Sequence, residues 1–477
     1  MMFADHISML PEFLLLCGMF VLLLAARFRQ NTTPKTYFTV SKIAVAAALL
    51  GTVVFYNQSF MPGWLINDSY TTLFKTLIYI AALASFYLGC KWFLNKNRSS
   101  LSFYLTALFS LLLLTLAVSA QNLLVLSACL TAAFVLNACF IIRLHPFDEV
   151  SRPVLRRYLW GCLAVVLLLA ASLLLFRRLG IPYDYAGACT YLEHLHRPGG
   201  LHYLAAVLLI VSLLYMLGIA PFHFWYADVL GGSVLPAGTY LTFIPPLAYL
   251  AVLVNLLSNV FFPLYGQLRL FLTGCAALSV ILGAVGANSE TNLRKLFAYV
   301  ALFNLGIVLM CVSELNDNGL LSGFVCLLVW LLAQFGIYTV FYAFKRKGDY
   351  LTETADLAGL AEVRPYIAAA MLIFMVSLLG TPPMLGFLGK LSAINYLIIE
   401  GSYAFIGLIL AALLLLAYAF LNVIKTIYFD ARGGNTFDRA DKGVYICLMV
   451  NLILVLISIL NPRYLMHDAE NILSTIL

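Results

Sequence analysis

The chain has 477 residues, of which 63% are hydrophobic and only 10% are charged, and its net charge is +7. A typical soluble chain carries roughly 25% charged residues, so this composition excludes an ordinary soluble enzyme. Apolar stretches of about twenty residues recur from end to end, and each is long enough to cross a hydrocarbon core of roughly 30 Å as a helix. The sequence therefore predicts an all-α polytopic membrane protein with about 14 TM helices.

The first apolar stretch differs from a secretion signal because it lacks a basic leader. It opens with Asp5, His6 and Glu12 and reaches its first arginine only at Arg27. This pattern predicts a retained transmembrane helix. Glu12 lies near the end of that helix, and we expect it at the membrane interface, as we do Glu400 near a later span.

Most of the 28 lysines and arginines fall in alternate loops, such as the segment containing Lys345, Arg346 and Lys347. Topology explains the positive charge better than nucleic-acid binding does, so no nucleic acid is expected as a partner. By the positive-inside rule, the loop charges place both termini on the periplasmic face of a bacterial inner membrane. Lys390 is the only lysine or arginine assigned to the interior of a span.

Two regions of the chain interrupt their apolar spans with proline and glycine. The first holds Pro221, Pro245 and Pro246, and the second holds Pro382 and Pro383. A proline inside a helix removes a backbone donor, and freed carbonyls are tolerated in a membrane only beside protein or water. The two regions therefore predict two structural repeats with one discontinuous helix each. Close helix packing alone is the alternative explanation.

The sequence has no phosphate-binding glycine loop, no haem or iron–sulfur pattern, and no metal-ligand spacing among its ten cysteines. The cysteines are scattered, and several lie inside apolar spans, which is typical of small buried side chains. We expect neither a metal nor a redox cofactor in this chain.

Four segments resemble the antiporter-like membrane subunits of respiratory complex I and the Mrp-type cation/proton antiporters. The most specific is Ser377-Leu-Leu-Gly-Thr-Pro-Pro-Met-Leu-Gly-Phe-Leu-Gly-Lys390, preceded by Asp356-Leu-Ala-Gly-Leu and Arg364-Pro365. The others are Ser119-Ala-Gln-Asn-Leu-Leu, Ala220-Pro-Phe-His-Phe-Trp-Tyr-Ala-Asp228 and Thr291-Asn-Leu-Arg-Lys-Leu-Phe-Ala-Tyr299. The short length and the Leu10-Pro11-Glu12 opening favour the N-type subunit within that family.

The resemblance implies a single membrane domain over residues 1–477. It comprises N-terminal helices (1–100), two inverted five-helix repeats (101–258 and 268–424) and a C-terminal helix (425–477). It also implies a membrane-arm subunit of a proton-translocating NADH:quinone oxidoreductase, with M-type and K-type neighbours and the lipid bilayer around it. Flavin, iron–sulfur clusters and quinone would belong to partner subunits.

Members of this family are thought to move a proton along a row of buried charged residues. Such residues are costly in a bilayer and persist with a partner, water or a function. Lys390 matches the last member of the row. The glutamate and the two lysines before it align with Thr131, Met216 and Pro246, and a usual histidine aligns with Asn304, none of which titrates near neutral pH.

The missing charges leave two interpretations open. In one, the subunit conducts no protons and serves as a structural or coupling element, an interpretation that three independent losses favour. In the other, different groups carry the proton, and His223, Asp228 and Lys295 are candidates. A subunit of a Mrp-type antiporter or a membrane-bound hydrogenase is a further alternative, because those complexes share the signature.

Overall fold

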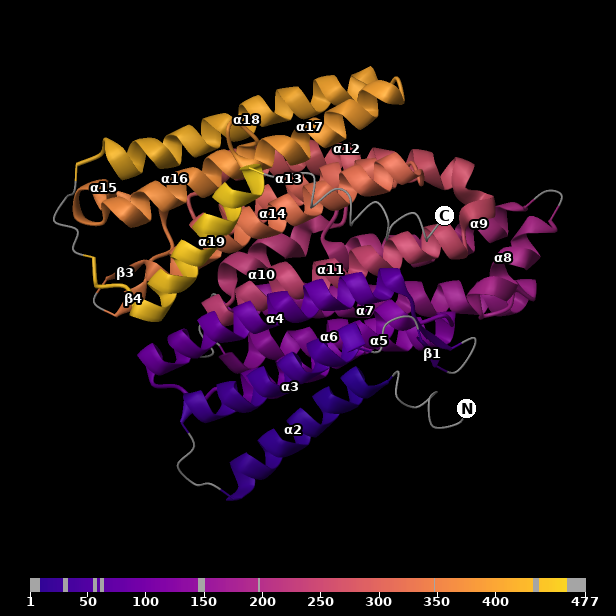
Figure 1. Ribbon diagram of the computed structural model, residues 1–477. Coiled ribbons are helices and arrows are strands. Elements are labelled where there is room, and N and C mark those ends of the chain that lie inside the picture. The colour runs from indigo at the N-terminus through magenta and orange to yellow at the C-terminus, as the bar shows by residue number, and fades with distance from the viewer. Residues whose placement is uncertain are drawn as a thin grey trace. The chain divides into compact units, whose positions relative to one another are not determined.

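A computed structural model describes residues 9–28, 33–54, 58–60, 64–144, 151–195, 198–346, 348–431 and 437–460. Across these residues the structure is all-α apart from two short hairpins, in line with the all-α fold that the sequence predicts (Figure 1). In the part of the chain that is described, twelve helices are long and apolar enough to cross a membrane, and α16, α17 and α19 are shorter apolar helices. The count of fourteen spans stays a prediction.

The helices and strands have the following bounds. The N-terminal helices are α2 (Leu10–Phe28), α3 (Pro34–Val54), α4 (Ser69–Lys96), α5 (Leu101–Ser119), α6 (Leu123–Leu144), α7 (Ser151–Leu179), α8 (Tyr185–Glu193) and α9 (Gly200–Leu217). They are followed by α10 (Tyr226–Gly232), α11 (Leu235–Asn259), α12 (Tyr265–Ser289), α13 (Leu293–Val312), α14 (Asp317–Ala343), α15 (Leu360–Val363), α16 (Pro365–Leu379), α17 (Leu385–Ile399), α18 (Tyr403–Tyr428) and α19 (Lys442–Leu460). Short 3-10 turns are η1 (His223–Trp225), η2 (Phe262–Leu264) and η3 (Thr354–Leu357), and the strands are β1 (Gln58–Phe60), β2 (Leu65–Asn67), β3 (Lys345–Arg346) and β4 (Asp349–Tyr350).

Both hairpins are antiparallel. In the first, Gln58 of β1 faces Asn67 of β2, and in the second, Lys345 faces Tyr350. The first hairpin leads directly into α4, which begins with a capping box: Asp68 accepts from the Thr71 amide at 2.8 Å, and the Thr71 hydroxyl accepts from the Asp68 amide at 3.0 Å. Such caps satisfy amides that the first helical turn leaves without partners.

The helices group into two compact units. The first holds residues 9–218 and 232–268, and the second holds residues 219–231 and the described residues from 269 onward. In the first unit, α11 packs against α4, α5, α6, α8 and α9, and almost all of its residues are buried. In the second unit, α14 occupies the corresponding central place, between α13, α16, α17 and α19. The repeat boundaries expected from the sequence stay a prediction.

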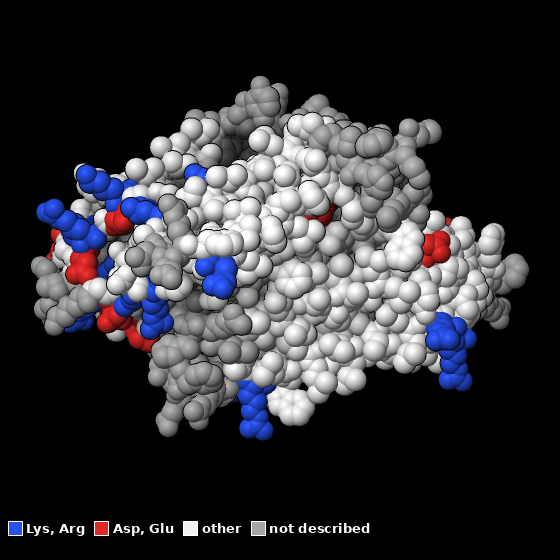
Figure 2. All heavy atoms as spheres, turned by 90° about the horizontal axis from the view of Figure 1, so that it is seen from below, with Lys and Arg blue, Asp and Glu red and all other residues white. Residues whose placement is uncertain are grey.

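Small residues allow helices of the second unit to approach closely. A Cβ at Gly283 on α12 would lie 2.6 Å from the Phe303 backbone nitrogen, and a Cβ at Gly306 on α13 would lie 2.9 Å from the Ser279 Cβ. Helices in a bilayer associate mainly through such close packing, because lipid is as apolar as the side chains it would replace. Uncharged side chains form most of the face of the molecule seen in Figure 2, as contact with lipid requires.

Candidate functional site

The second unit contains a helix broken into two halves, α16 and α17. The chain leaves α16 at Gly380, whose φ of 82° is the left-handed conformation that glycine adopts readily. Pro382 and Pro383 lie in the five-residue connection, residues 380–384, between α16 and α17. The two halves touch at Gly386, where a Cβ would overlap the Ser377 carbonyl, so only glycine fits.

Lys390 lies on α17, one turn beyond Gly386, and is 8% exposed. Its ammonium donates a hydrogen bond to Oδ1 of Asn304 on α13. The same nitrogen lies 5.0 Å from the centre of the Phe303 ring, where the face of an aromatic ring attracts a cation. The side chain that the sequence singles out is thus buried among α13, α14 and the two half-helices.

A small cavity adjoins Lys390. It offers about 10 Å³ to the centre of a water molecule and is bounded by Asn304, Cys326, Trp330 and Ser377 together with Lys390. This is close to the smallest space that holds one water. The site can therefore hold the ammonium of Lys390 against a neutral amide acceptor, Asn304, and place one water beside it.

Asp228 and Lys295 come together in the second unit. Asp228 lies near the start of α10, and Lys295 lies in the first turn of α13, with 2.9 Å between its ammonium and Oδ1 of Asp228. The amide of Lys295 is held by the side chain of Asn292, which caps α13. Both ionic side chains are partly exposed, at 31% for Lys295 and 21% for Asp228.

His223 lies in the turn that precedes α10, also in the second unit. Burial lowers the pKa of its imidazole, and a hydrogen bond with the Pro221 backbone opposes this effect. The turn is fixed to α12, because the Ala220 amide donates to the Ser279 hydroxyl at 2.9 Å. The structure thus brings Asp228 and Lys295 together, while no hydrogen bond joins His223 to either of them among the described residues.

Three positions at which the family resemblance predicts charged residues, Thr131, Met216 and Pro246, lie in the first unit. Thr131 on α6 donates its hydroxyl to the backbone carbonyls of Ser127 and Ala128, and Met216 on α9 is buried. The expected helix break at Pro245 and Pro246 is wrong, because α11 continues through both prolines. Each proline removes one donor, and the packing of α11 among five neighbouring helices keeps the rest of the helix in place.

A second buried lysine corrects the expectation that Lys390 is alone inside a span. Lys75 on α4 is 1% exposed, and its ammonium lies 2.6 Å from Oε1 of Glu12 on α2. Glu12 itself is 5% exposed and lies in the first turn of α2, and its expected place at the membrane interface stays a prediction. A lysine within an apolar span and a glutamate near the start of another are the sequence signals that could have suggested this pair.

In the part of the chain that the structure describes, no group of three or more His, Cys, Asp and Glu side chains could hold a metal ion.

The helical architecture and the buried cation on a broken helix define a polytopic, antiporter-like membrane protein. The chain belongs to the NADH:quinone oxidoreductase/Mrp antiporter transmembrane family, whose sequence profile matches residues 155–415. It is 27% identical to NADH-quinone oxidoreductase subunit N of Rhodospirillum rubrum over 433 residues, covering 88% of this chain and 87% of that one.

Two solved structures share the fold. A chain of respiratory complex I from Thermus thermophilus superposes with a TM-score of 0.77 and 24% identity, covering 95% of this chain and 97% of that one. A chain of an archaeal membrane-bound sulfane sulfur reductase superposes with a TM-score of 0.84 and 16% identity, covering 98% of each chain.

Proposed function

We propose that this chain is a membrane-arm subunit of a proton-translocating NADH:quinone oxidoreductase, where it contributes to proton translocation or to its coupling. The observation that carries the proposal is Lys390, a buried amine on a half-helix beside a cavity for one water. An ionisable group inside a membrane protein is costly unless it is paired or functional. The likeness to subunit N of Rhodospirillum rubrum over most of both chains supports the same assignment.

In this proposal, Lys390 belongs to a polar path through the second unit. The Asp228–Lys295 pair, with His223 nearby in the sequence, belongs to the end of that unit where α10 and α13 begin. The first unit has Thr131, Met216 and Pro246 where the family resemblance predicts charged residues. Electron transfer would take place in partner subunits that hold flavin, iron–sulfur clusters and quinone, and M-type and K-type subunits would be the neighbours in the membrane.

The proposed location is a bacterial inner membrane with both chain termini on the periplasmic side. The basic loop after α14, containing Lys345 and Arg346, would then be cytoplasmic. Reporter fusions in this loop test the orientation, and activity of a periplasmic reporter there would contradict it.

Lys390→Met tests the functional proposal, because methionine fills a similar volume and binds no proton. The complex that contains this chain is purified and reconstituted into proteoliposomes. Two quantities are then measured: the rate of quinone reduction, and the number of protons moved per electron pair, which is here called the proton yield. We expect the yield to fall while quinone reduction continues.

An unchanged yield would favour the non-conducting structural role instead. Co-purification with antiporter or hydrogenase subunits, and without quinone-reductase activity, would favour the remaining alternatives.

A further inference from the structure

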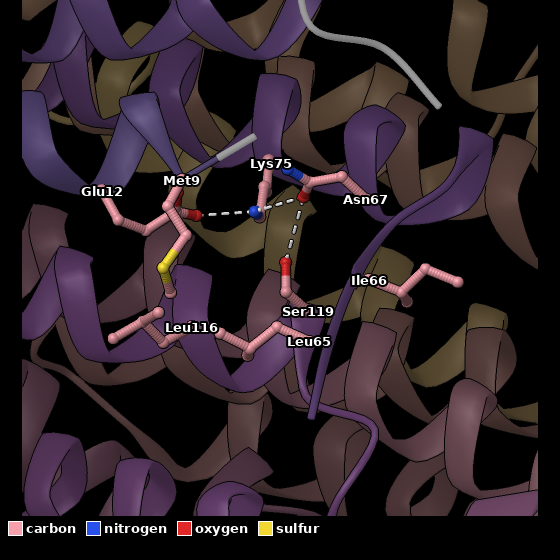
Figure 3. A pocket seen from close by; sticks show the side chains of 8 residues that line it. All are labelled: Met9, Glu12, Leu65, Ile66, Asn67, Lys75, Leu116 and Ser119. Atoms are coloured by element: carbon pink, nitrogen blue, oxygen red, sulfur yellow. Dashed lines mark hydrogen bonds and ion pairs between the residues drawn. The ribbon is translucent and has the colours of Figure 1, made fainter. Parts of the chain in front are cut away.

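The first unit contains a closely spaced buried pair of opposite charges that lies outside the site around Lys390. Glu12 on α2 and Lys75 on α4 are 63 residues apart in the sequence, and their side chains meet at 2.6 Å. Figure 3 shows both side chains pointing into one pocket, together with Asn67 and Ser119. The pair is thus enclosed by α2, α4, α5 and the hairpin strand β2.

The polar neighbours of the pair hold Lys75 from a second side. Oδ1 of Asn67 accepts hydrogen bonds from the Lys75 ammonium at 2.7 Å and from the Ser119 hydroxyl at 3.3 Å. Asn67 is the last residue of β2, and Ser119 is the last residue of α5. The ammonium is therefore fixed by two oxygens, one anionic and one neutral.

Glu12 has one oxygen left over. Oε2 is buried and has no hydrogen-bond partner among the described residues. The adjoining cavity offers about 10 Å³ to the centre of a water molecule, which is close to the smallest space that holds one water. Buried polar atoms are nearly always hydrogen-bonded, so a water at Oε2 is the expected partner.

The geometry permits a proton to move without creating an isolated buried charge. When the N–H bond of Lys75 breaks and an O–H bond forms on Oε1 of Glu12, the ammonium and carboxylate become an amine and a carboxylic acid. The pair is neutral overall before and after this transfer. Burial penalises an isolated charge far more than a pair that is neutral overall, so transfer within the pair avoids that larger cost, although the ion-pair form is itself desolvated.

The pair of Glu12 and Lys75 also lies close to the N-terminal ends of α2 and α4. Lys75 is six residues beyond the start of α4, which is roughly 9 Å along the helix. Tyr79 follows one turn deeper on α4, and its buried hydroxyl has no hydrogen-bond partner among the described residues. Polar groups on α2 and α4 thus continue inward from the end of the helices where the hairpin lies.

We propose that Glu12, Lys75 and one water form a proton-exchange site in the first unit, which lacks titratable side chains at Thr131, Met216 and Pro246. In the form with a carboxylic acid and an amine, the O–H bond of Glu12 breaks and the proton passes to the water, which becomes hydronium and passes a proton on. A proton returning from hydronium then binds the carboxylate of Glu12 or, through it, the amine of Lys75, which restores a neutral pair and the water. This inference rests on the proposed function, because it assigns a second proton-carrying site to the same subunit.

Two variants test the proposal in the intact complex in proteoliposomes. Glu12→Gln keeps an oxygen that accepts from Lys75 but exchanges no proton, and Lys75→Arg keeps the positive charge but releases no proton. We expect each variant to lower the proton yield while quinone reduction continues, and Glu12→Asp to restore the yield at least in part. Lys75→Arg keeps an ion pair and so tests the proposal even if Glu12→Gln prevents assembly.

Glu314→Gln is the matched control. It removes a carboxylate that also lies 2.6 Å from its cation, but that cation is Arg269, which does not release a proton in proteins. A normal proton yield in Glu12→Gln or Lys75→Arg would overturn the proposal, and so would an equal fall in Glu314→Gln. Failure of the proposed function is recognised separately, because wild-type complex would then move no protons or lack quinone reductase activity.

Discussion

The ammonium of Lys295 lies 2.9 Å from the carboxylate of Asp228, across 67 residues of sequence. Both side chains are partly exposed, so solvent screens their attraction and the pair should contribute only about 0.2–1 kcal/mol. A double-mutant cycle with Asp228→Asn and Lys295→Gln, measured as thermal unfolding of the purified complex, should give a coupling energy of that size. A coupling well above it would show that the surroundings desolvate the pair more than its exposure indicates.

Asn304 provides the hydrogen-bond acceptor for Lys390. Asn304→Leu should leave the buried ammonium without this partner, at a cost of about 1–3 kcal/mol, and should lower the proton yield. Asn304→His, which places there the histidine that the family resemblance predicts, should keep the yield because a neutral imidazole also accepts a hydrogen bond. Equal yields in the leucine and histidine variants would contradict this role.

Gly386 sets the distance between the two half-helices. An alanine Cβ at this position would overlap the Ser377 carbonyl, so Gly386→Ala should force α16 and α17 apart. We expect a loss of about 1–3 kcal/mol, seen as a lower unfolding temperature or reduced assembly of the complex. Gly407→Ala on α18 is the control, because a Cβ there would meet no atom within 4 Å.

His223 should make stability depend on pH. Because burial lowers its folded-state pKa, the unfolded chain takes up the proton first as the pH falls. The stabilisation due to neutral His223 should be present above the unfolded value of about 6.5 and be lost as the pH falls toward the folded value. The unfolding temperature of the complex should therefore fall less between pH 7.5 and 5.5 in His223→Gln than in the wild type. An identical fall in both proteins would refute this.

The sequence predicts features that depend on local chemistry. The length of the apolar stretches identifies the helices. One long stretch is divided where its prolines lie: α16 ends at Leu379 and α17 begins at Leu385. The same reasoning is wrong at Pro245 and Pro246, because a proline removes a donor locally while the surrounding helices decide whether the helix ends.

Pairing between distant segments is the part that the sequence does not reveal. Glu12 and Lys75 come together only when α2, α4 and the hairpin pack, and each alone resembles a side chain at the end of a span. Lys390 is recognisable from its segment alone, whereas its partner Asn304 lies 86 residues away on α13. No periodicity or spacing in the sequence links such pairs.

The two adjacent prolines in α11 have a mechanical consequence for the first unit. Neither Pro245 nor Pro246 has an amide hydrogen, so two consecutive i→i−4 backbone hydrogen bonds are missing near the middle of a 25-residue helix. Helix kinks concentrate where these hydrogen bonds are absent, as at proline. Because α11 touches α4, α5, α6 and α9, any bending at this joint would be transmitted to the helices that carry Lys75 and Ser119.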